Sequence, residues 1–146
     1  PMRPTSRGHV KLKSNNAKDS PLIQFNYMQT ENDLREMREG IKIAREIFFQ
    51  REFDEFRGKE ISPGESVHTD EDLNKFIRDK GDTAYHPSCT CKMGKDETSV
   101  VDEELKVYGI DNLRIVDASV MPNIITGNLN ASTVMIAEKA SEMLIW

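Results

Sequence analysis

The chain has 146 residues, the length of one ordinary domain, and 37% of them are apolar, which is enough to build a hydrophobic core. Charged residues make up 31% and the formal net charge is −5, which argues against a nucleic-acid partner because such proteins present a basic face. No apolar run approaches the roughly 20 residues of a transmembrane segment, and the opening residues show no signal peptide. Because the chain opens on Pro1 instead of Met, we expect a piece of a longer protein.

The first predicted element is a β-hairpin. His9–Lys13 alternates polar and apolar side chains, as a half-buried strand does, and a second apolar run covers Leu22–Tyr27. The intervening residues are rich in Ser, Asn and Asp, which favour a turn.

A long amphipathic helix follows the hairpin. Thr30 is its expected N-cap, and Asp33 three residues later completes a capping box. Apolar residues at three- and four-residue steps are expected to share one face of this helix: Leu34, Met37, Ile41, Ala44, Ile47 and Phe48.

A shorter helix is predicted after a connector that covers Phe56–Val67. It starts at Thr69, carries Leu73, Phe76 and Ile77, and ends at Gly81.

The remaining chain mixes loops, short strands and one helix. Tyr85–Gly94 is a loop of small and polar residues, and strand-like pieces cover Lys106–Tyr108 and Leu113–Val116. An apolar helix is predicted over Ala131–Leu144. Strands and helices without regular βαβ alternation indicate the α+β class, with a mixed or antiparallel sheet and packed helices.

His86 is the ionisable residue most suited to chemistry. It precedes Pro87, which favours an extended backbone, and a fixed imidazole can act as a general base near neutral pH. Taken alone, the pattern favours a structural histidine.

Cys89 and Cys91 raise an alternative, a binding or metal module that also uses His86. Structural zinc sites have four ligands, so these three predict no metal site. Cysteines one residue apart point away from each other, which disfavours a disulfide and indicates a reducing compartment.

The last candidate is Gly127–Asn130, directly before the final helix. Its asparagines can cap that helix, or they can present amides to a ligand at its positive end. Capping is the favoured interpretation of this segment alone. No local nucleotide-binding fingerprint or hydrolase motif accompanies it.

Three stretches together resemble the C-terminal region of the glucose-methanol-choline (GMC) oxidoreductases, in the right order and across nearly the whole chain. They are Arg3-Pro-Thr-Ser-Arg-Gly-His-Val-Lys-Leu, Tyr85-His-Pro-Ser-Cys-Thr-Cys-Lys-Met-Gly, and Asn112-Leu-Arg-Ile-Val-Asp-Ala-Ser-Val-Met-Pro continued by Gly127-Asn-Leu-Asn-Ala-Ser-Thr-Val-Met-Ile-Ala-Glu. The resemblance implies that residues 1–146 form the C-terminal domain of a larger two-domain FAD enzyme, without its N-terminal Rossmann-type portion.

The resemblance also implies roles for particular residues. His86 matches a catalytic histidine over the flavin, and Asn128 matches the residue that completes the catalytic pair. The positions that match cofactor-binding segments are Asp117, Ala118, Leu129, Asn130 and Thr133.

The middle stretch is most similar to the choline-oxidising branch of the family. The implied activity of the whole protein is FAD-dependent oxidation of choline to betaine aldehyde, a step of glycine betaine synthesis, with another primary alcohol as the alternative substrate. The electron acceptor, oxygen or a respiratory carrier, stays open, as do a cytoplasmic and a membrane-associated location. We expect this chain alone to lack FAD and turnover, and to self-associate through an exposed sheet edge.

Overall fold

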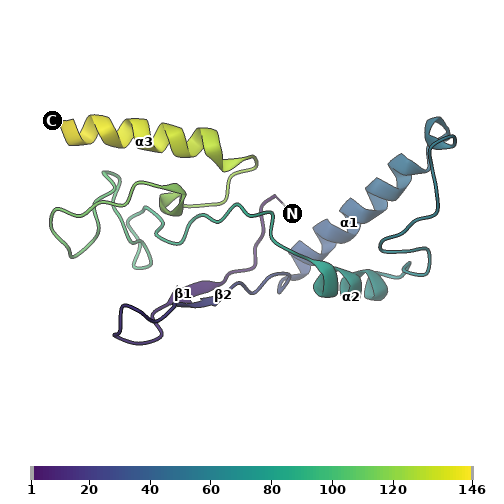
Figure 1. The fold of residues 1–146 in the computed structure, drawn as a ribbon, viewed down its shortest axis with the longest axis horizontal. Helices are drawn as coiled ribbons and strands as arrows, with labels where there is room; N and C mark the ends of the chain where they lie inside the picture. Colours follow the sequence, from purple (N-terminus) through teal and green to yellow (C-terminus); the bar gives the residue numbers. More distant parts are fainter. Residues whose placement is uncertain (1, 146) are drawn as a thin grey trace. The chain divides into compact units, whose positions relative to one another are not determined.

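The computed structural model describes residues 2–145 and contains two compact units. One unit is Arg3–Asp82, and the other runs from Thr83 to the end of the described residues. The mixture of helices with a two-stranded antiparallel sheet confirms the α+β class, as a fragment of a larger fold (Figure 1). The assignment of residues 1–146 to one domain of the whole protein stays a prediction.

The predicted hairpin is confirmed in the first unit. Strand β1 (His9–Lys11) pairs antiparallel with β2 (Leu22–Gln24), and Val10 lies opposite Ile23. Inside the connecting turn, the Asp19 backbone N–H donates to the Asn16 carbonyl at 3.0 Å. All residues of both strands are exposed, so the hairpin presents both of its faces to solvent in this unit.

Helix α1 (Glu31–Phe48) begins directly after Thr30, the predicted N-cap. The Thr30 hydroxyl accepts a hydrogen bond from the Asp33 backbone N–H at 3.3 Å. The predicted capping box is wrong, however, because the Asp33 carboxylate turns toward the N-terminal segment. It accepts from the backbone N–H groups of Thr5 and Ser6, at 2.7 and 2.9 Å, and from both of their hydroxyls.

The buried Asp33 carboxylate is held in its ionised form. Burial raises the pKa of this group, but the hydrogen bonds from Ser6 and Thr5 outweigh that effect and lower the pKa well below its ordinary value of 3.8. Four donors on one carboxylate therefore fasten the Thr5–Ser6 segment to the start of α1.

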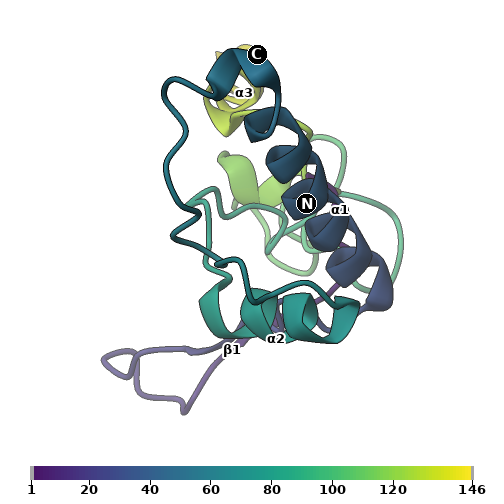
Figure 2. The ribbon, with the colours of Figure 1, turned by 90° about the vertical axis from the view of Figure 1, so that its right-hand side faces the viewer.

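Helices α1 and α2 (Asp70–Lys80) pack together around a small core (Figures 1 and 2). The buried core side chains are Leu34, Leu73 and Ile77, with Met28, Met37, Ile41, Val67 and Phe76 packed around them. The predicted apolar face of α1 is only partly correct. Ile47 and Phe48 are 51% and 58% exposed, because α2 covers the N-terminal part of α1 and not its end.

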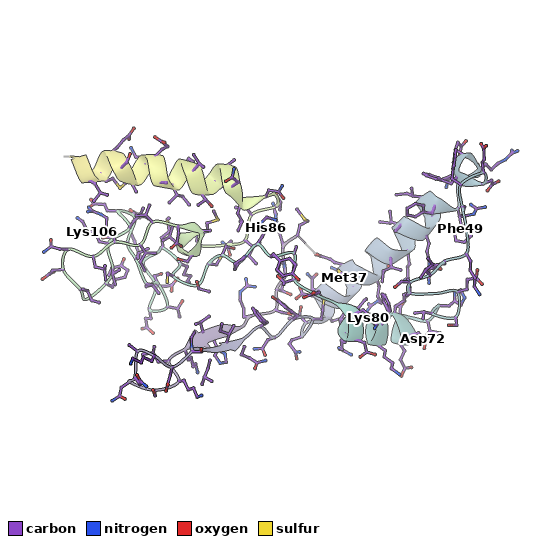
Figure 3. All side chains as sticks on the ribbon, in the orientation of Figure 1. Met37, Phe49, Asp72, Lys80, His86 and Lys106 are labelled. Atoms are coloured by element: carbon purple, nitrogen blue, oxygen red, sulfur yellow. The ribbon has the colours of Figure 1, made fainter. Side chains whose placement is uncertain are left out.

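The predicted boundaries of α2 are confirmed. Thr69 and Asp72 form a reciprocal capping box at its start, and Gly81 follows its last residue. Arg38 links α2 to α1, since its guanidinium donates to Asn74 at 2.6 Å and pairs with Glu31 at 2.6 Å. Figure 3 labels Asp72 and Lys80 on α2.

Gly40 lies inside α1, where glycine weakens a helix. A Cβ added there would meet no atom within 4 Å. We expect Gly40→Ala to stabilise the chain by about 0.5–1 kcal/mol, because alanine loses less backbone entropy on folding. Urea unfolding followed by circular dichroism measures this change. An unchanged or lower unfolding free energy would contradict the prediction.

In the second unit, the two predicted strand-like pieces form isolated bridges and not continuous strands. Lys106 pairs with Arg114, and Val107 pairs with Val101. Helix α3 (Leu129–Ile145) starts two residues before the expected Ala131. None of the helices described has the length and apolar character needed to cross a membrane.

Candidate active site

The loop that carries His86 has no helix or strand of its own, as Figure 3 shows. Its second half is held by backbone hydrogen bonds to a short 3-10 helix, η2 (Ala118–Val120). The N–H groups of Cys89, Cys91 and Met93 donate to the carbonyls of Ala118, Ser119 and Val120, at 3.3, 2.9 and 2.8 Å. These three bonds bring the second and third stretches singled out in the sequence into direct contact.

Asp117 fixes the start of η2. Its carboxylate accepts a hydrogen bond from the Ser119 backbone N–H at 2.7 Å, and its own carbonyl accepts from Val120 at 3.3 Å. The side chains of Val120 and Met121 are buried in the core of the second unit. The family resemblance implies that Asp117 contacts the cofactor, and in the structure its carboxylate caps η2.

The start of α3 packs on the same core as η2. Leu129 is buried there beside Val120 and Met121, together with Ile136 and Ala140 further along the helix. Asn128 is the residue directly before α3 and is exposed. The core of the second unit therefore holds both η2, to which the His86 loop is hydrogen-bonded, and the helix that follows Asn128.

The candidate site residues differ in their exposure. His86, Asn128, Asp117 and Asn130 are exposed, whereas Ala118 and Thr133 are half-buried. Leu129 has a buried side chain, so only its backbone can face a ligand. The Thr133 hydroxyl donates to the Leu129 carbonyl of the preceding helical turn at 2.8 Å.

The N-terminus of α3 is the positively polarised end of a helix. Its first turn contains no acidic residue, and the exposed Asn128 and Asn130 flank it. The unpaired N–H groups of a helix start carry about half a positive charge, which stabilises negative charge placed near them. The sequence predicted that Asn130 precedes the final helix. In the structure Asn130 lies in the first turn of α3.

The cysteine-based alternative gains no support from the structure. Cys89 and Cys91 are both free thiols, and the Cys89 Sγ contacts the Ser88 hydroxyl at 3.3 Å. Among residues 2–145, no three His, Cys, Asp or Glu side chains come together in a way that could hold a metal ion.

Two surface hollows lie away from the candidate residues. A hollow of about 380 Å³ is lined by charged and polar residues of α2, and one of about 400 Å³ lies around Lys95, Ser99 and Tyr108. Neither hollow is lined by His86 or Asn128.

Two features next to His86 were not predicted. Tyr85 and Cys89 have left-handed backbones, with φ of 59° and 70°. Neither residue type signals this conformation in a sequence, because glycine and asparagine are the usual residues there. Only the tertiary structure could reveal them.

The sequence model of the GMC oxidoreductases matches residues 4–137. This chain belongs to the GMC oxidoreductase family.

Curated relatives show which members of the family the chain is similar to. The chain is 59% identical over 143 residues to an oxygen-dependent choline dehydrogenase of Pseudomonas fluorescens, an alignment that covers 98% of this chain and 25% of the relative. The chain thus spans about a quarter of the length of the curated relatives it matches.

Solved structures agree with the family. The chain is similar to pyridoxine 4-oxidase from Mesorbium loti, with a TM-score of 0.89 and 35% identity over 97% of this chain and 28% of that one. It is also similar to an FAD-dependent oxidoreductase from Chaetomium thermophilum, with a TM-score of 0.90 and 29% identity over 98% of this chain and 25% of that one.

Proposed function

We propose that the whole protein is an FAD-dependent choline dehydrogenase that oxidises choline to betaine aldehyde. The 59% identity to an enzyme of that name, across 98% of this chain, is the observation that carries the proposal. His86, Asp117 and Asn128 also lie within residues 4–137, which match the family model. The relative is named as oxygen-dependent, so we propose oxygen as the electron acceptor.

The proposed site has two working side chains. His86 takes the proton of the substrate hydroxyl, and its exposed imidazole in an irregular loop leaves room for that approach. The Asn128 amide donates a hydrogen bond to the oxygen as negative charge builds on it. The bound flavin supplies the acceptor for the hydride that leaves the hydroxyl carbon.

The residues of this chain fit one end of a flavin. The start of α3 offers a positive helix end without acidic side chains, which suits the negative charge that a reduced flavin carries. The backbone at Leu129 and Asn130 would face the ring, and Asp117 and Ala118 would approach the rest of the cofactor. Thr133 lies one turn inside α3, where its hydroxyl supports the helix start.

The remaining three quarters of the protein complete the site in this proposal. His86 and Asn128 are exposed and line neither of the two hollows described above, so walls from elsewhere would enclose the substrate. We therefore propose that this chain alone binds no FAD and turns over no substrate. Its exposed hairpin strands also support the expected self-association.

A second candidate is oxidation of another primary alcohol. It is favoured by the structural likeness to an enzyme named for pyridoxine, since the same C-terminal fold there accompanies a different substrate. None of the proposed site residues of this chain is assigned to recognise a trimethylammonium ion.

Anaerobic reduction of the flavin tests the proposed function. Choline added to the full-length protein without oxygen is expected to bleach the visible flavin absorbance, and oxygen is expected to restore it. An uncharged primary alcohol of similar length serves as the matched control and should bleach the flavin far more slowly. Bleaching by the uncharged alcohol alone would favour the second candidate, and a protein that binds no FAD even after reconstitution would overturn both.

A further inference from the structure

The loop around His86 is bounded by two residues in an uncommon backbone conformation. Tyr85 directly before it has φ of 59°, and Cys89 three residues after it has φ of 70°. In this left-handed region the Cβ atom of any residue other than glycine crowds the backbone. Such conformations persist where the surrounding structure enforces them, and they cluster at functional sites.

The two residues are held very differently. The Tyr85 backbone N–H donates to a neighbouring side chain, the Thr83 hydroxyl, at 3.0 Å, and the Tyr85 side chain is 77% exposed. The Cys89 N–H donates to the Ala118 carbonyl at 3.3 Å, and its half-buried side chain packs on the core of the second unit. Cys89 is therefore the point where the loop joins rigid structure.

The hydrogen bonds to η2 continue along the chain after Cys89. Cys91 and Met93 donate to Ser119 and Val120, and Val120 is fully buried. The chain is fixed from residue 89 onward, so the left-handed turn at Cys89 sets the direction in which residues 86–88 leave the core.

We propose that Cys89 is a positioning residue for His86, and that it acts through its left-handed backbone and not through its thiol. This inference rests on the proposed function, in which His86 takes the proton of the substrate. The thiol contacts only the neighbouring Ser88 hydroxyl among the hydrogen bonds described, whereas the backbone N–H anchors the loop to η2. A side chain that resists left-handed φ would move the imidazole away from the reacting hydroxyl.

The test compares substitutions at Cys89 in the full-length flavoenzyme. Asparagine and valine have similar sizes and both lack a thiol, but asparagine tolerates left-handed φ and the β-branched valine does not. We expect Cys89→Asn to turn over choline about tenfold or more faster than Cys89→Val, at similar KM and per bound flavin, because small displacements of a catalytic group cost large factors in rate. If Cys89→Val binds no flavin, Cys89→Gly against Cys89→Ala makes the same comparison, with the glycine variant faster.

A second measurement separates positioning from general damage. When His86 is already alanine, the difference between Cys89→Asn and Cys89→Val should disappear, because both act through the missing imidazole. Equal turnover of the two Cys89 variants, whether close to that of the unaltered enzyme or far below it, would overturn the positioning proposal. A difference between them that persists without His86 would overturn it as well. Turnover by His86→Ala within tenfold of the unaltered enzyme would instead overturn the proposed role of His86, and the positioning proposal with it.

Discussion

Replacing His86 by alanine in the full-length protein is expected to lower turnover of choline by about two to four orders of magnitude, the range for a lost general base. The loss should appear in kcat more than in KM, because the imidazole acts on the proton that moves in the transition state. Steady-state oxygen consumption, corrected for flavin content, measures it. Added imidazole should restore part of the rate.

The two other histidines provide matched controls for this experiment. His9 lies in β1 and His68 directly before Thr69, and neither belongs to the second unit. Alanine at either position should change turnover less than about threefold, because both side chains are exposed and neither belongs to the proposed chemistry. A His86→Ala variant that stays within tenfold of the unaltered enzyme would remove His86 from the proposed chemistry.

Replacing Asp33 by asparagine is expected to destabilise the chain by about 2–4 kcal/mol. The change keeps the size of the side chain but leaves one acceptor oxygen for the two N–H and two hydroxyl donors of Thr5 and Ser6. The new amide N–H₂ would also face some of those donors at a buried position. Urea unfolding of both chains at pH 7 measures the difference.

Asp72→Asn is the matched control, because Asp72 also follows a threonine N-cap by three residues but is exposed. Its substitution should cause a much smaller loss of stability. A loss at Asp33 no greater than at Asp72 would show that the four-donor cluster contributes little.

The effect of Asp33→Asn should depend on pH in a defined direction. The native pKa of Asp33 lies below the ordinary 3.8, so the unfolded chain binds a proton before the folded chain does. The stabilisation by the carboxylate is therefore fully present above pH 3.8 and declines as the pH falls toward the native pKa. The unfolding free energies of the two chains should converge in acid, which a urea series between pH 6 and about 2 would detect.

The sequence by itself determined the local structure of the first unit. Both of its α-helices begin after a threonine whose hydroxyl satisfies a free backbone N–H, and the hairpin forms at the turn predicted from its polar residues. Such signals act within a few residues, so they can be recognised without knowledge of the fold. The motifs around His86 and Asn128 likewise indicated the family from their order alone.

The tertiary structure decided which groups meet across long separations. Asp33 had the sequence of a capping-box residue, yet its carboxylate binds Thr5 and Ser6, because a buried carboxylate must take its hydrogen bonds from the protein instead of from water. The hydrogen bonds between the His86 loop and η2, and the left-handed backbone at Cys89, have no local signal either. Local sequence fixes where helices and turns start, whereas burial and the need to pair every buried polar group decide how distant segments of a site are joined.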